Sequence, residues 1–519
     1  MSIKSLHDSN GATLDLSITL KKNVLANYLG QGWRVLMSLA FVPMYIKYLG
    51  IEAYGLIGLF AMLQVSLNIL DMGMKPTLGR EMARFTGGAH HKQSIWNLLR
   101  SIEIISICVA LLLAIGIWVI SGWLATDWIQ VEKLSVELVA HTFAIMGVVA
   151  ALQFLESIYS STIVGLQKQV TYNVVASLMV TARCLGAVGI LVWFSPTISA
   201  FFLWQGLISL VTVAFFAVVV YRVLPLPPHP AHFSMDALKS IWRYAAGMIG
   251  ITSLGVLLTQ TDKLLLSRLL SLETFGYYAL ASVVAGSLYM LTGPVTAAFF
   301  PRFTELLTKG DDIGLRRSYH QGAQLVTVLM GSAAVILIVY ADKLIQLWTG
   351  DLYLTEQVAP LVSVLALGTL LNGLMWIPSQ MQLAHGWTSL GLIINSITVL
   401  VFIPAILWIV PQYEAIGAAW IWVALNAGYV FIGIHFMYHR ILCNEKWIWY
   451  FVDILFPLIV ASVTAMACRW IMPEESGLIS EIFVVLMCSL AVVTVTCLSA
   501  PLIRKQLIYF FTSMTRNLG

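Results

Sequence analysis

The sequence predicts an all-α polytopic membrane protein with about 14 transmembrane helices, and three observations support this fold class. Of the 519 residues, 59% are hydrophobic and only 10% are charged, and the mean hydropathy is +0.87. Apolar runs about 20 residues long, the length that a span requires, recur along the whole chain. Lysine and arginine gather in alternate loops between these runs. Soluble proteins carry about 25% charged residues, so the composition excludes a soluble enzyme.

The apolar runs are bounded by polar residues, glycine and proline, and we expect one helix for each run. Pro196, Pro411 and Pro473 mark tight turns, and a proline-rich stretch that begins at Pro225 marks the main internal linker. The expected spans are residues 24–46, 54–73, 99–120, 137–160, 173–194, 199–221, 244–266, 275–297, 321–341, 359–381, 390–410, 415–436, 450–471 and 479–499.

The placement of lysine and arginine predicts the orientation, because cytoplasmic loops carry an excess of both residues. With the N-terminus inside, 21 of the 29 lysines and arginines fall in cytoplasmic segments and 6 fall on the outer side. The remaining 2, Arg34 and Arg183, lie deep inside apolar runs. We therefore expect both termini in the cytoplasm, which requires an even number of spans.

An internal repeat appears when the chain is compared with itself at an offset of 221 residues. Residues 48–56 (YLGIEAYGL) match residues 269–277 (LLSLETFGY), so that Glu52 aligns with Glu273. Six spans in each half predict a parallel repeat, which is a common plan for transporters. The expected divisions are an N-terminal segment 1–23, an N-lobe 24–222, a cytoplasmic linker 223–243, a C-lobe 244–437, helices 13 and 14 in 450–499, and a tail 500–519.

Several short motifs carry a resemblance to a known family. They are VPMYIKYLGIEAYG at residues 42–55, LDMGM at 70–74, TQTDK at 259–263, FGYY at 275–278 and LWTG at 347–350. The chain resembles Wzx-type polysaccharide and O-antigen flippases of the multidrug/oligosaccharidyl-lipid/polysaccharide (MOP) exporter superfamily. The resemblance covers most of the chain, although its motifs are diffuse.

The resemblance implies two pseudo-symmetric six-helix lobes in a V, as in MATE-like transporters, and two additional C-terminal helices. It implies transport of an undecaprenyl-pyrophosphate-linked oligosaccharide from the inner to the outer leaflet of the bacterial cytoplasmic (inner) membrane by alternating access. The product would be O-antigen, capsule or exopolysaccharide. The expected partners are this lipid-linked oligosaccharide, membrane lipids, and the polymerase and chain-length regulator of the pathway. Nucleic acid is not expected.

Two arginines are the candidate substrate-binding residues. Arg34 lies about ten residues, or roughly 15 Å, into the first span. An arginine at that depth is costly and usually faces a polar cavity, and its planar guanidinium suits a diphosphate. Arg183 is central in the fifth span, close to Thr181 and Gly186, which suit close helix packing. For both, a structural pairing with a neighbouring helix remains the alternative.

Charged residues near the ends of spans are candidates for a gate or for coupling. Each also has a simpler interpretation as a solvated or anchoring interfacial charge. These candidates are Asp71, Arg80, Arg84, Glu156, Asp262 and Lys263.

The sequence predicts a non-enzymatic protein without a cofactor or metal. It contains no G-x-x-x-x-G-K-[ST] motif, and its six cysteines form no C-x-x-C pair. One alternative is a MATE-like small-molecule antiporter, which needs a carboxylate deep in one lobe. Another is a membrane glycosyltransferase or polymerase of the same pathway, which is expected to carry a sizeable outer loop. The expected outer loops are short, the longest being about residues 121–136 and 342–358.

Overall fold

The computed structural model describes residues 25–518, apart from residues 72, 388 and 473–477. Nearly all of these residues are helical, and the one β-type pairing among them is an isolated bridge between Gln130 and Ser271. The predicted all-α fold is confirmed. The chain divides into two compact units, Met1–Glu273 and Thr274–Gly519.

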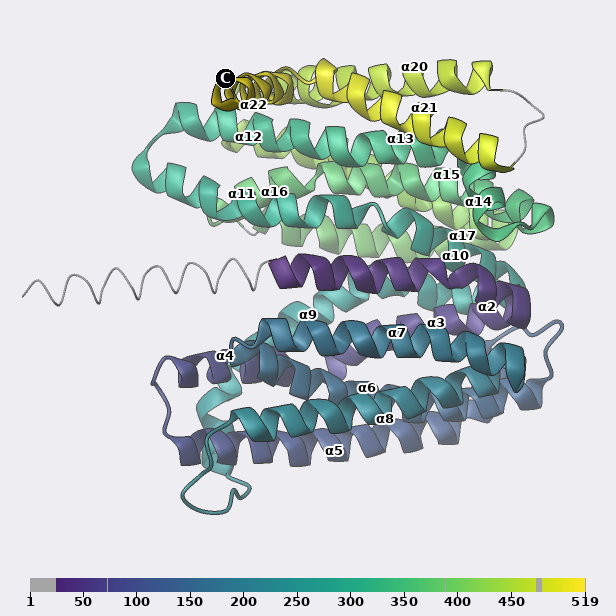
Figure 1. Ribbon diagram of the computed structural model, residues 1–519, viewed down its shortest axis with the longest axis vertical. Coiled ribbons are helices and arrows are strands. Elements are labelled where there is room, and N and C mark those ends of the chain that lie inside the picture. The colour runs from purple at the N-terminus through teal and green to yellow at the C-terminus, as the bar shows by residue number, and fades with distance from the viewer. Residues whose placement is uncertain (1–24, 72, 388, 473–477, 519) are drawn as a thin grey trace, which may run out of the picture. The chain divides into compact units, whose positions relative to one another are not determined.

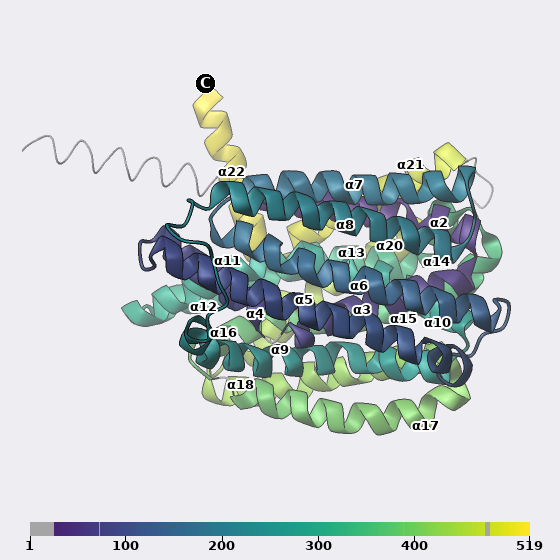
Figure 2. The same ribbon diagram turned by 90° about the horizontal axis from the view of Figure 1, so that it is seen from below.

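The first unit is a bundle of long helices (Figure 1). Its first helix covers residues 25–40 of the described chain. The other helices are α2 (Val42–Leu49), α3 (Ile51–Leu70), α4 (Met74–Thr86), α5 (Lys92–Trp123) with a π-helical end (Leu124–Trp128), α6 (Val136–Gly165), α7 (Gln169–Trp193), α8 (Ile198–Val223) and α9 (Met235–Leu269). Helix α6 packs against α4, α5 and α8, and α7 packs against α8 (Figure 2).

Helix α9 belongs to the first unit by its contacts, although it opens the second half of the sequence repeat. It packs against α3, α4 and α5. The boundary between the compact units therefore falls at Glu273, after α9, and not in the linker that precedes it. The division into lobes 24–222 and 244–437 follows the sequence repeat and stays a prediction.

The second unit contains the remaining helices. They are α10 (Leu272–Gly286, which begins at the boundary), α11 (Tyr289–Lys309), α12 (Asp312–Val326), a π-helix (Thr327–Gly331), α13 (Ser332–Val339), α14 (Ala341–Thr349), α15 (Leu352–Leu374), α16 (Trp376–Ala384), α17 (Ser389–Gly428), a π-helix (Tyr429–Gly433), α18 (Ile434–Arg440), α19 (Lys446–Ile448), a π-helix (Trp449–Leu455), α20 (Phe456–Ile471), α21 (Leu478–Ser499) and α22 (Pro501–Leu518). Within this unit α11 packs against α12, α15 against α17, and α20 against α21.

Helix α17 contains a break where the sequence predicts a turn between two spans. Glu414 has φ 50° and ψ −141°, which is not helical. The break lies three residues after Pro411, and it separates the expected spans 390–410 and 415–436. The 40-residue element is therefore two helices joined by a turn.

Polar residues fix where several helices begin. The first N–H groups of a helix have no partner within it, and a side-chain oxygen at the preceding position can accept from one of them. Such caps are Ser135 on Leu138 N, Thr197 on Ala200 N, Ser234 on Ala237 N, Asp311 on Gly314 N and Asp351 on Leu354 N.

The exterior of the helices is apolar, as expected for a protein in lipid. Leu112, Trp193 and Phe194 are 71%, 80% and 81% exposed. In the described part of the chain, 10 helices are long and apolar enough to cross a membrane, and one of them, Ser389–Arg440, covers two expected spans. The protein is a multi-pass membrane protein, and the number of 14 spans remains a prediction.

Candidate functional site

The first helix packs along α7 through a glycine and a series of polar contacts. A Cβ atom on Gly30 would lie 2.4 Å from Oδ1 of Asn173, so the close approach of the two helices requires a glycine. Nδ2 of Asn173 donates to Oδ1 of Asn27 over 2.6 Å. Farther along, Nε1 of Trp33 donates to Oγ1 of Thr181 over 2.9 Å. The order of these contacts shows that the two helices run in the same direction.

The side chain of Arg34 also lies at this contact between the two helices, and it is half-buried. Its Nη1 donates to Oδ1 of Asn173 over 3.1 Å. Its guanidinium carbon lies 5.7 Å from the centre of the Tyr172 ring, which is within the range of a cation–π interaction. None of the ion pairs found among the described residues includes Arg34. An amide and an aromatic ring thus hold this arginine, and its charge is not neutralised by them.

Arg183 has a different environment, although it lies on the same helix as Asn173. Its Nη2 lies 3.3 Å from Oε2 of Glu156 and 3.2 Å from Oγ of Ser209. The side chains of Arg183 and Glu156 are only 19% and 24% exposed. Nε of Arg183 is buried and forms no hydrogen bond with any residue that the structure describes. Arg183 is therefore held in an ion pair between α6 and α7. This is the pairing with a neighbouring helix that the sequence analysis gave as the alternative to substrate binding.

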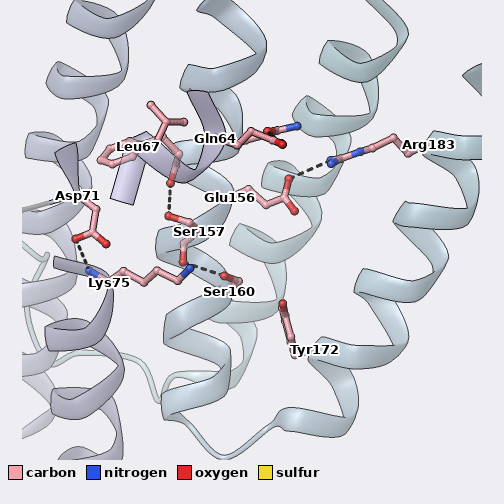
Figure 3. Close-up of a pocket in the computed structure, with 11 residues that line it drawn as sticks. Gln64, Leu67, Asp71, Lys75, Glu156, Ser157, Ser160, Tyr172 and Arg183 are labelled. Carbon is pink, nitrogen blue, oxygen red and sulfur yellow. Dashed lines mark hydrogen bonds and ion pairs between the residues drawn. The ribbon is translucent and has the colours of Figure 1, made fainter. Parts of the chain in front are cut away.

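A polar cavity of about 270 Å³ lies beside this ion pair (Figure 3). Four of its lining residues are charged, namely Asp71, Lys75, Glu156 and Arg183. The side chains of Glu156 and Arg183 point toward each other, and Lys75 extends toward Ser160. The rest of the lining is Gln64, Leu67, Gln153, Phe154, Ser157, Ser160 and Tyr172.

Tyr172 connects the two arginine sites, because its ring lies near Arg34 and also lines the cavity. Of the predicted site residues, the structure thus brings Asp71, Glu156 and Arg183 to one cavity and places Arg34 next to it. Asn173 and Tyr172 were missed, because single polar residues within an apolar run carry no distinctive sequence pattern.

Arg80 and Arg84 lie on α4 and are not part of the cavity lining. Both contact Glu81, at 3.6 Å for Arg80 and 3.0 Å for Arg84. His90 also lies within 2.6 Å of Glu81, whose side chain is only 2% exposed. The predicted basic cluster is thus organised around a buried carboxylate that the sequence analysis did not single out. The arginines themselves are about half exposed, at 45% and 49%.

Asp262 and Lys263 lie near the end of α9 and are half-buried. They do not line the polar cavity beside Arg183. Their role in a gate or in coupling stays a prediction.

The repeated Glu52 has a clear structural role. Its carboxylate accepts hydrogen bonds from three consecutive backbone N–H groups, those of Glu132, Lys133 and Leu134, over 2.7 to 3.2 Å. Its repeat counterpart Glu273 forms an ion pair with Lys133. Both glutamates of the repeat therefore anchor the same loop, between α5 and α6.

A second buried polar network lies in the second unit. Asp453 is fully buried, is hydrogen-bonded to Nδ1 of His320, and accepts from Nε2 of Gln324 over 2.8 Å. Nε2 of His320 lies 3.3 Å from Oε2 of Glu445. Oε1 of Gln324 accepts from the backbone N–H of Leu502 over 2.8 Å. The network fastens α12 to the π-helix before α20 and to α22. The sequence signal was a lone aspartate in an apolar run.

Residues 47–356 match the sequence family described as polysaccharide biosynthesis protein. The chain belongs to this family. It is 20% identical over 408 residues to the putative O-antigen transporter of Shigella flexneri, covering 78% of this chain and 94% of that relative. It is 22% identical over 301 residues to the teichuronic acid biosynthesis protein TuaB of Bacillus subtilis, covering 57% of this chain and 60% of that relative.

Solved structures with the same fold are membrane transporters. The lipid II flippase MurJ in an inward closed conformation matches with a TM-score of 0.68 at 12% identity, over 91% of this chain and 97% of MurJ. An inward-facing multidrug resistance MATE family transporter of the MOP superfamily matches with a TM-score of 0.63 at 15% identity, over 80% and 96% of the two chains. The expected MOP exporter fold is confirmed.

Proposed function

We propose that this protein is a flippase. It moves an undecaprenyl-pyrophosphate-linked oligosaccharide from the inner to the outer leaflet of the bacterial cytoplasmic membrane by alternating access, for the synthesis of O-antigen, capsule or exopolysaccharide. Membership of the polysaccharide biosynthesis family and the fold shared with MurJ support a transporter of this class. The name of the Shigella relative points to the same kind of cargo.

The observation that carries the proposal is the environment of Arg34. A charged guanidinium deep in a membrane span is costly, so such residues usually serve a polar pathway. Arg34 is held by Asn173 and Tyr172, which orient it but leave its charge uncompensated. A diphosphate would supply the compensating negative charge and could accept two parallel hydrogen bonds from the guanidinium N–H groups. Arg34 is therefore the proposed site of the pyrophosphate.

The membrane potential could drive this transport. Each elementary charge that crosses the membrane exchanges about 2.3 kcal/mol per 100 mV. A diphosphate with two negative charges that moves outward across a membrane whose inside is negative gains about 4–5 kcal/mol per 100 mV if no other charge compensates it. Transport then requires no nucleotide hydrolysis by this chain, and we propose a transporter without enzymatic activity.

The polar cavity favours a second candidate function, a MATE-like antiporter. Such a protein needs a carboxylate that can bind a coupling ion, and the cavity contains Asp71 and Glu156. Glu156 is already paired with Arg183, however, and Lys75 lies in the same cavity. Two cations beside two carboxylates balance their charge, so an additional cation gains little there. We therefore place the antiporter second.

Complementation of a flippase-deficient strain tests the proposal. Arg34→Ala should abolish surface polysaccharide while the protein remains in the membrane, because the diphosphate loses its cation. Arg34→Lys keeps the charge without the two-pronged geometry and should retain partial export. Export is measured from surface polysaccharide, and membrane abundance from a blot.

Arg222→Ala is the matched control, since Arg222 is an exposed arginine at the end of α8. It should export normally. Normal export by Arg34→Ala at wild-type abundance would contradict the proposed role of Arg34. If the wild-type chain changes resistance to cationic drugs but restores no polysaccharide, the antiporter is correct.

A further inference from the structure

A groove runs between the first helix and α7, on the first unit. Its volume is about 790 Å³, which lies within the range of ligand sites, about 300–1,000 Å³. Its walls are apolar side chains, each between 42% and 65% exposed. These wall residues are Leu25, Leu29, Trp33, Val170, Val174 and Leu178.

The wall residues follow the helical repeat on both helices. On the first helix they recur every four residues, and on α7 they recur at the same spacing. Residues with this spacing lie on one face of a helix. The wall on the first helix therefore extends over two turns, about 12 Å at 1.5 Å per residue. Gly30 and Asn173 are the buried residues of the lining, and the two helices approach closely there.

The groove contacts the proposed diphosphate site. Asn173 lines the groove and also accepts the hydrogen bond from Arg34. Arg34 directly follows the wall residue Trp33 in the chain. An apolar groove thus lies beside a cation, and Asn173 contacts both. The contacts of Arg34 with described residues do not balance its charge. This pattern is complementary to an amphiphile that has an anionic head and an apolar chain.

A second apolar cavity in the same unit provides a comparison. It measures about 320 Å³ and is lined by residues of α3, α5, α6 and α9, together with the segment after α5. None of the described residues that line it is ionisable. An apolar lining alone therefore does not mark a site for this substrate, and the adjacent cation distinguishes the groove.

We infer that the groove between the first helix and α7 binds the polyprenyl chain of the substrate, next to its diphosphate on Arg34. This inference rests on the proposed function. One groove between two helices accommodates one chain, which fits a polyprenyl lipid with a single tail. A phospholipid has two tails for one head. Binding of the first isoprene units orients the diphosphate toward the guanidinium and selects lipid-linked over free sugar diphosphates.

Filling the groove tests the inference. Ser177 lines the groove on α7, and Ala26 lines it on the first helix. Ser177→Trp should block the polyprenyl chain from the α7 side of the groove, and Ala26→Trp should block it from the side of the first helix. Ala214→Trp is the matched control, because Ala214 is an exposed small residue of α8 outside the groove. The purified full-length protein is titrated with two probes, inorganic pyrophosphate and farnesyl diphosphate.

Wild-type protein should bind farnesyl diphosphate more tightly than pyrophosphate. Each groove-filling variant should weaken the binding of farnesyl diphosphate by about tenfold or more, since several buried methylene groups lose their contacts. The affinity for pyrophosphate should not change, which also shows that the variant is folded. The control should bind both probes as wild type does.

Two results would overturn the inference. One is an unchanged preference for farnesyl diphosphate in both groove-filling variants while export still depends on Arg34, which leaves the proposed function intact. The other is that phosphatidic acid vesicles compete with farnesyl diphosphate for the protein as well as farnesyl diphosphate itself does, and that Ser177→Trp abolishes this competition. That result would assign the groove to ordinary lipid. If wild-type protein binds neither probe and restores no export, the proposed function itself fails.

Discussion

Arg34 and Arg183 are both arginines in apolar helices of the same unit, yet their surroundings differ. Arg183 faces Glu156 at 3.3 Å and Ser209 at 3.2 Å. Arg34 has an amide acceptor at 3.1 Å and an aromatic ring. Asn173, which is the α7 contact of Arg34, and Arg183 itself lie ten residues or about 15 Å apart along the helix. The charge of Arg183 is therefore balanced within the protein, whereas the charge of Arg34 is available to an anionic ligand. In the sequence, both are arginines deep inside apolar runs.

The largest effect on stability should come from disrupting the balanced pair. Arg183→Met leaves Glu156 without its cation, and an uncompensated carboxylate in this setting should cost on the order of 3 kcal/mol. The double variant Arg183→Met/Glu156→Leu removes both charges and should recover most of that loss. Unfolding of the purified protein in detergent measures both effects. Equal destabilisation by the single and double variants would show that the pair is not the source of the effect.

Removing the amide that orients Arg34 should have a smaller effect. Asn173→Ala removes an acceptor from Arg34 and a donor from Asn27. Partly buried polar groups that lose a partner cost about 1–3 kcal/mol, so the variant should be moderately destabilised. Export should fall but persist, because the charge of Arg34 remains. A complete loss of export at normal abundance would instead place Asn173 itself in contact with the substrate.

The smallest effect should come from the ring beside Arg34. Tyr172→Phe keeps the face of the ring and should leave export close to wild type. Tyr172→Ala removes the cation–π contact, which is worth about 0.5–1 kcal/mol at such a site, and should reduce export severalfold at most. Dose–response complementation at graded expression resolves such differences. If Tyr172→Phe is as defective as Tyr172→Ala, the phenolic hydroxyl is the important group.

The sequence predicted the helices well, because long apolar runs leave the backbone no other way to satisfy its hydrogen bonds in lipid. The expected span 99–120 lies within α5, and the turn near Pro411 appears as the break at Glu414. The contact boundary of the first unit could not be predicted, since it depends on the packing of α9 against α3.

The site was only partly predictable from the sequence. Arg34 and Arg183 stood out because charges in spans are costly. Their partners did not, because Glu156 lies 27 residues from Arg183 and Asn173 lies 139 residues from Arg34, so that only helix packing brings them together. The network around Asp453 was missed for the same reason, since His320 is 133 residues away.

The affinity of purified protein for inorganic pyrophosphate tests the difference between the two arginines most directly. Arg34→Ala should raise the dissociation constant by about tenfold or more, because a charge-assisted hydrogen bond is worth about 1.5–3 kcal/mol. The variant Arg183→Met/Glu156→Leu should bind like wild type, since its lost charges were already balanced. The reverse result, with unchanged affinity in Arg34→Ala and lost affinity in the double variant, would place the diphosphate at Arg183 and contradict the proposed role of Arg34.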